Sequence, residues 1–145
     1  MDLFEAADLR EAVRREDAAM ARKPLLCLDF DGTIHSYRSG WKAAEIVEDE
    51  PVPGALEFMY DAMEYFRVAV FSSRSSSPGG MMAMKDWVDR ECRKKWFGNE
   101  WWFQIEWPNS KPAAFVSLDD RAITFKGVWP ELRELANFQP WHRGR

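Results

Sequence analysis

Six polar or charged residues stand at the predicted ends of buried strands or in the turn before one. They are Asp29, Asp31, Ser72, Lys111, Asp119 and Asp120. The apolar runs that precede or follow them occupy residues 25–30, 67–71 and 113–118. Since the carboxyl ends of parallel strands meet at one edge of a sheet, we expect these groups to share one crevice. Buried carboxylates placed so close together are costly unless a cation neutralises them.

The residue types in this crevice suit phosphate chemistry. Magnesium prefers oxygen ligands, with one or two carboxylates, water and a substrate phosphate. Beside such a cation, Asp29 stays ionised and can attack phosphorus as a covalent nucleophile. Asp31 can protonate the leaving alkoxide and later activate water. Lys111 and Ser72 can hold the phosphoryl oxygens.

Helical and strand patterns alternate along the chain, which predicts an α/β fold with a doubly wound, mainly parallel sheet. Pro24 and Gly32 bound the first strand, and prolines near 51–53 precede the second helix. The pattern predicts helices at 2–22, 51–66, 80–97 and 129–138, and strands at 25–30, 67–71, 101–107, 113–118 and 121–127.

Four short motifs in order resemble those of the haloacid dehalogenase (HAD) superfamily. The segment 29–33, "DFDGT", resembles its first motif, and Ser72 after an apolar strand resembles its second. Lys111 in "SKP" resembles the third motif, and the pair Asp119 and Asp120 in "SLDD" resembles the acidic fourth. The resemblance spans most of the chain.

The resemblance implies a Rossmann-like three-layer α/β/α sandwich, bound Mg²⁺ and an aspartyl-phosphate intermediate. Asp29 would be both nucleophile and metal ligand, and Asp31 the acid and base, with its backbone carbonyl on the metal. Asp120 would contact the metal directly, with Asp119 behind it. The loop 33–53 is too short for a cap domain, so the resemblance is to small capless members of bacterial or phage type.

The predicted function is a Mg²⁺-dependent hydrolase of phosphomonoesters, acting on a small molecule or on a macromolecule that reaches an open site. Residues expected to grip the substrate are His35, Arg38, Lys42 and Arg74. One alternative is a phosphatase that processes 3′-phosphate ends of nucleic acid, which the net charge of −4 disfavours. Another is a non-catalytic, metal-binding shell of the same fold. The order of the motifs argues against a phospho-acceptor receiver domain.

Each motif also has a structural interpretation. An Asp-Gly pair is common in turns, and Ser72 lies next to a serine-rich loop. Lys111 could be a solvated side chain, and Asp119 with Asp120 a surface turn. The agreement of four strand ends favours the functional interpretation.

Composition sets the remaining expectations. The 145 residues suit one domain at 24–145, preceded by a helical extension at 1–23. No apolar run approaches the ~18–20 residues that span a membrane, the N-terminus lacks a secretion signal, and two isolated cysteines fit a reducing compartment. We therefore expect a cytoplasmic protein without membrane partners. The aromatic segment 96–107 is expected to pack in the fold or to mediate a homodimer.

Overall fold

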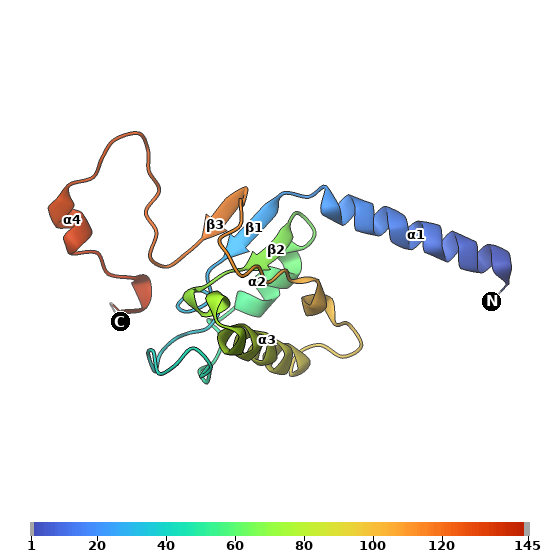
Figure 1. Cartoon of the computed structure of the whole chain (residues 1–145), viewed down its shortest axis with the longest axis horizontal. Coiled ribbons are helices and arrows are strands. Elements are labelled where there is room, and N and C mark those ends of the chain that lie inside the picture. The colour runs from blue at the N-terminus through green and yellow to red at the C-terminus, as the bar shows by residue number, and fades with distance from the viewer. Residues whose placement is uncertain (1, 144–145) are drawn as a thin grey trace.

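The computed structural model describes residues 2–143 and shows an α/β fold around a three-stranded parallel sheet (Figure 1). The strands are β1 (Leu25–Leu28), β2 (Arg67–Val70) and β3 (Val116–Leu118), in the spatial order β2-β1-β3. The apolar residues of β1 and β2 are almost all buried, as is usual in parallel sheets. The predicted parallel sheet is confirmed.

The strand order creates a switch point at the end of β1. From β1 the chain passes through α2 (Ala55–Ala62) to β2 on one side, and later reaches β3 on the other side. The amide of Asp29 donates to the carbonyl of Leu118 at 2.9 Å, so pairing of β1 with β3 continues to the first acidic residue. In open α/β sheets, ligands bind at such a point.

Helices α2 and α3 (Pro78–Arg93) pack buried side chains into the core that supports the sheet. Met59 of α2 and Trp87 of α3 are fully buried among the strand side chains. The Ser77 hydroxyl accepts a hydrogen bond from the amide of Gly80 at 3.3 Å, which caps the start of α3. Trp87 Nε1 donates to the carbonyl of Asp49 at 2.8 Å, so α3 also fixes the loop that follows β1.

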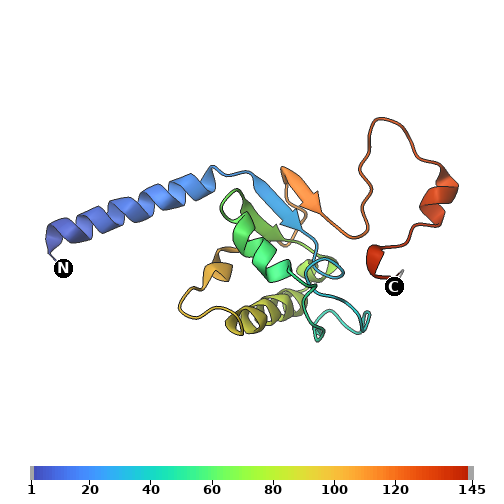
Figure 2. The same cartoon turned by 180° about the vertical axis from the view of Figure 1, so that it is seen from behind.

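Both ends of the described chain leave the sheet. Helix α1 (Leu3–Ala21) projects away from it (Figure 1). A C-terminal arm, residues 121–143, departs from β3 and contains α4 (Leu132–Ala136), and it returns toward the sheet with the 3₁₀ helix η3 (Trp141–Arg143) (Figure 2). Val116 and Leu118 of β3 share a face with Leu26 and Leu28 of β1 but are 41% and 43% exposed.

The helices and strands occur largely where the sequence predicts them, with two corrections. The predicted strand 101–107 is a 3₁₀ helix, η2 (Trp101–Gln104), followed by an isolated bridge between Ala69 and Glu106. Consecutive residues of a strand point to opposite faces, whereas this turn lets both Trp101 and Trp102 bury. The predicted strand 121–127 is irregular chain in the arm.

Segment 96–107, predicted to pack in the fold or to mediate a homodimer, contains both buried and exposed aromatic rings. Trp101 and Trp102 belong to the core, while Phe97 and Phe103 are exposed. The homodimer through this segment stays a prediction. Among the helices of residues 2–143, none is both long enough and apolar enough to cross a membrane.

The two cysteines offer a test of the packing. Cys27 and Cys92 are buried free thiols. Burial raises the pKa of both, in the case of Cys92 to about 12. We expect neither thiol to react with a disulfide reagent at pH 8 in the folded protein, because reaction needs an exposed thiolate. Both should react in guanidinium, and rapid reaction of one thiol in native buffer would contradict the packing described.

Candidate metal centre

Three carboxylates converge at the switch point of the sheet. Asp29 follows β1, and Asp119 and Asp120 follow β3. One oxygen of each lies within 4.8 Å of the others. The sequence predicted this meeting from strand ends alone, because paired parallel strands deliver their next residues to the same edge.

The electrostatics of the cluster favour a bound cation. Burial, a hydrogen bond shared with Asp120 and the negative charges of Asp119 and Asp120 raise the pKa of Asp29 to about 8. The Asp120 side chain is only 2% exposed, and its Oδ1 atom is buried without a hydrogen-bond donor among the described residues. An unsatisfied buried carboxylate oxygen beside two other acids fits a hard cation with oxygen ligands.

Gly32 provides the space that the cluster occupies. Its φ angle of +82° lies in the left-handed region, where residues with a Cβ atom are strained. A Cβ atom at this position would collide with Oδ2 of Asp120 and lie 2.6 Å from Nε2 of His142. The glycine of the "DFDGT" segment is therefore required both by its backbone angle and by the side chains against it.

The C-terminal arm contributes contacts that the sequence reasoning missed. His142 Nε2 lies 2.8 Å from Oδ2 of Asp120, and Trp141 Nε1 donates to the carbonyl of Gly32 at 2.8 Å. No spacing rule links residue 142 to the motifs. The available signal was the scarcity of histidine, since the chain has two and both contact an aspartate of the motifs.

Asp31 faces a different environment from Asp29. Its Oδ1 lies 2.9 Å from Nδ1 of His35, and its Oδ2 accepts from Nε of Arg74 at 2.8 Å. Burial alone would raise the pKa of Asp31, but hydrogen bonds from His35 and Arg74, with the Arg74 charge, hold this pKa below its ordinary value. The amide of Asp49 donates to Nε2 of His35, so Nδ1 carries the ring proton and donates to Asp31.

Arg74 is buried and joins several elements. Its Nη1 atom donates to the carbonyls of Ala43, Ala44 and Ile46 at 2.8–3.0 Å. Its guanidinium also lies 4.7 Å from the ring centroid of Trp41. The amide of Arg74 donates to the Ser72 hydroxyl at 3.0 Å. Ser72, which the sequence predicts to bind phosphate, therefore caps the turn after β2.

The residues predicted to bind the substrate have different environments in the structure. His35 and Arg74 are buried and hold Asp31. Arg38 is exposed and pairs with Glu50 at 2.8 Å, and Lys42 is exposed and pairs with Glu48. Lys111 is exposed, and within residues 2–143 it has no hydrogen bond or ion pair, although its charge acts on the Cys27 thiol.

Comparison with known proteins adds no relative. No protein-family model, curated protein or solved structure matches the chain. The chemistry that the site can perform is therefore inferred from its own residues.

Cation binding should stabilise the fold through Asp120. We expect Mg²⁺ to raise the free energy of unfolding of the wild-type protein by about 2.7 kcal/mol at a hundredfold excess over Kd. In Asp120→Asn this gain should disappear. In EDTA the variant should unfold at the same or a higher temperature, since one of the repelling acids is gone. Thermal unfolding with Mg²⁺ and with EDTA measures both effects.

The matched control for this experiment is Asp86→Asn, which changes an exposed aspartate of α3. It should keep the full gain from Mg²⁺. An equal gain in Asp120→Asn would contradict the assignment of the cluster.

Replacing Gly32 should damage the site beyond the backbone strain. Gly32→Ala and Gly54→Ala both place a Cβ atom at φ +82°, but only Gly32 has neighbours within 4 Å. Each variant should lose about 1–3 kcal/mol of unfolding free energy from strain. Only Gly32→Ala should also lose the stabilisation by Mg²⁺, because its Cβ displaces the Asp120 carboxylate. Identical behaviour of the two variants would refute this role.

Proposed function

We propose that the chain is a Mg²⁺-dependent phosphatase of the haloacid dehalogenase type, which hydrolyses a phosphomonoester through an aspartyl-phosphate on Asp29. The observation that carries the proposal is the meeting of Asp29, Asp119 and Asp120, in which Oδ1 of Asp120 is buried with no donor among residues 2–143. The proposal includes a Rossmann-like, three-layer, capless fold. A parallel sheet with its switch point at this cluster supports it.

The metal would be held by oxygen atoms at the ends of β1 and β3. Asp29 and Asp120 are the expected direct ligands, with the Asp31 backbone carbonyl beside them and the exposed Asp119 behind. Bound Mg²⁺ would offset the charges of these carboxylates and of the phosphoryl group. The three carboxylates are hard donors of the kind this ion selects.

The first half of the reaction forms a covalent intermediate. An oxygen of Asp29 attacks phosphorus, the new O–P bond forms, and the bond to the leaving oxygen breaks. The leaving alkoxide takes a proton from Asp31 and departs as an alcohol. Lys111, which has no ion pair among the described residues, is the expected cation for the phosphoryl oxygens, and the Ser72 hydroxyl the expected donor.

The second half regenerates the enzyme. Water attacks phosphorus, Asp31 accepts a proton from that water, and the bond between phosphorus and Asp29 breaks to release phosphate. Hydrogen bonds from His35 and Arg74 hold the pKa of Asp31 below its ordinary value, and the charged form that they favour supports a role as base in this half. These two residues position Asp31 and need not touch the substrate.

Removing the nucleophile should abolish turnover. The purified chain is expected to release phosphate from a panel of phosphomonoesters with Mg²⁺, and EDTA should stop it. Asp29→Asn should lower kcat by at least about a thousandfold, since an amide cannot form the acyl phosphate. Asp86→Asn should retain wild-type rates. Phosphate release that survives in Asp29→Asn would exclude this mechanism.

A panel that includes oligonucleotides with 3′-phosphates separates the substrate classes. Turnover of those ends alone would favour the nucleic-acid alternative. Mg²⁺ binding without any turnover would favour the non-catalytic metal-binding shell.

A further inference from the structure

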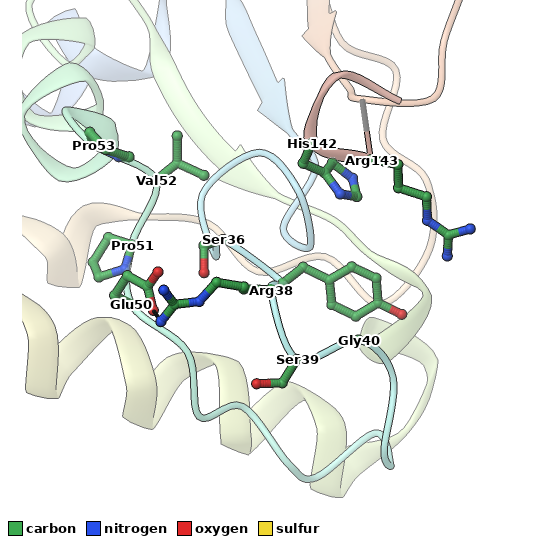
Figure 3. Close-up of a pocket in the computed structure, with 11 residues that line it drawn as sticks. Ser36, Arg38, Ser39, Gly40, Glu50, Pro51, Val52, Pro53, His142 and Arg143 are labelled. Carbon is green, nitrogen blue, oxygen red and sulfur yellow. Dashed lines mark hydrogen bonds and ion pairs between the residues drawn. The ribbon is translucent and has the colours of Figure 1, made fainter. Parts of the chain in front are cut away.

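A cavity of about 610 Å³ lies between the loop after β1 and the end of the C-terminal arm (Figure 3). Residues 36–40 and 50–53 form most of its wall, and His142 and Arg143 close it from the arm. In Figure 3, His142 and Arg143 lie across the cavity from Glu50 and Pro51. This volume is in the range of sites for small organic molecules.

The cavity adjoins the candidate metal centre through one side chain. His142 lines the cavity, and its Nε2 atom lies 2.8 Å from Oδ2 of Asp120. Tyr37, another wall residue, packs edge-on against the His142 ring with centroids 6.2 Å apart. Tyr37 holds a φ of +58°, the one positive φ of a non-glycine residue within residues 2–143. The His142 side chain therefore contacts both the candidate metal centre and the cavity.

The lining has an excess of positive charge. The lining contains two arginines, Arg38 and Arg143, and one carboxylate, Glu50. Glu50 pairs with Arg38 at 2.8 Å. Arg143 forms no ion pair with any of the described residues. Ser36 also lines the cavity, and its own hydroxyl oxygen is buried with no hydrogen-bond partner among residues 2–143. An arginine at the cavity without a carboxylate partner favours an anionic ligand.

We propose that this cavity binds the leaving group of the substrate, and that this group carries a second anion that pairs with Arg143. The inference rests on the proposed phosphatase function and names its substrate class: a small phosphomonoester that also bears a carboxylate or a second phosphate. Pro51, Val52 and Pro53 offer an apolar wall for its carbon skeleton. The C-terminal arm thereby takes part in substrate selection.

A matched pair of esters tests the proposal. 6-Phosphogluconate and glucose 6-phosphate have similar size, but only the first carries a carboxylate. The wild-type protein should hydrolyse 6-phosphogluconate with a kcat/KM about tenfold higher, the usual order for one charge-assisted contact. In Arg143→Gln the ratio of the two kcat/KM values should fall to about one, and Arg143→Lys should keep part of the preference.

The control is Arg133→Gln, which removes an exposed arginine of the same arm that does not line the cavity. It should leave the ratio unchanged. A wild-type ratio near one, or an Arg143→Gln ratio equal to wild type, would overturn the inference while Asp29-dependent phosphate release upheld the phosphatase function.

A binding measurement separates the two proposals if no ester is turned over. In that case the phosphatase function fails, and calorimetry with 6-phosphogluconate examines the cavity by itself. Binding by the wild-type protein that weakens about tenfold in Arg143→Gln would support an anion site there. Absence of binding, or equal binding by both proteins, would overturn it.

Discussion

The ion pair between Arg74 and Asp31 fixes the relative positions of the segments that make the site. The guanidinium lies between the carboxylate after β1 and the carbonyls of the loop at residues 43–46. Burying an arginine without such partners would be costly, so the loop and Asp31 must keep their places for the charge to be satisfied. His35 completes the arrangement, since it donates to Asp31 and accepts from the amide of Asp49. The loop wall of the cavity is ordered as a consequence.

The same constraint gives two neighbouring carboxylates opposite properties. Asp29 and Asp31 are two residues apart, and both are mostly removed from solvent. Burial among other acids raises the pKa of Asp29, whereas Asp31, also buried, has its pKa lowered by hydrogen bonds from His35 and Arg74. A cation would supply for Asp29 the positive charge that Arg74 supplies for Asp31.

The sequence predicted the parts of this arrangement that depend on local pattern and topology. Apolar runs identified β1, β2 and β3, and the rule of strand ends brought Asp29 to Asp119 and Asp120. It could not predict that Arg74 turns inward, because an arginine in a serine-rich loop carries no periodic signal. Nor could it predict η2, since an aromatic run fits a buried strand or a 3₁₀ turn equally, and only the packing of both Trp101 and Trp102 decides.

The position of the C-terminal arm could not be predicted from the sequence, because it depends on a few long-range hydrogen bonds. Trp141 bonds to Gly32 and His142 to Asp120, and α4 between them and β3 packs little of its surface. The contact with Asp120 uses Oδ2, while Oδ1 has no donor among the described residues. If the proposed cation binds, Oδ1 would therefore be available to it while the arm keeps its contact with Oδ2. Binding of a cation need not displace the arm, so the cavity can persist beside an occupied centre.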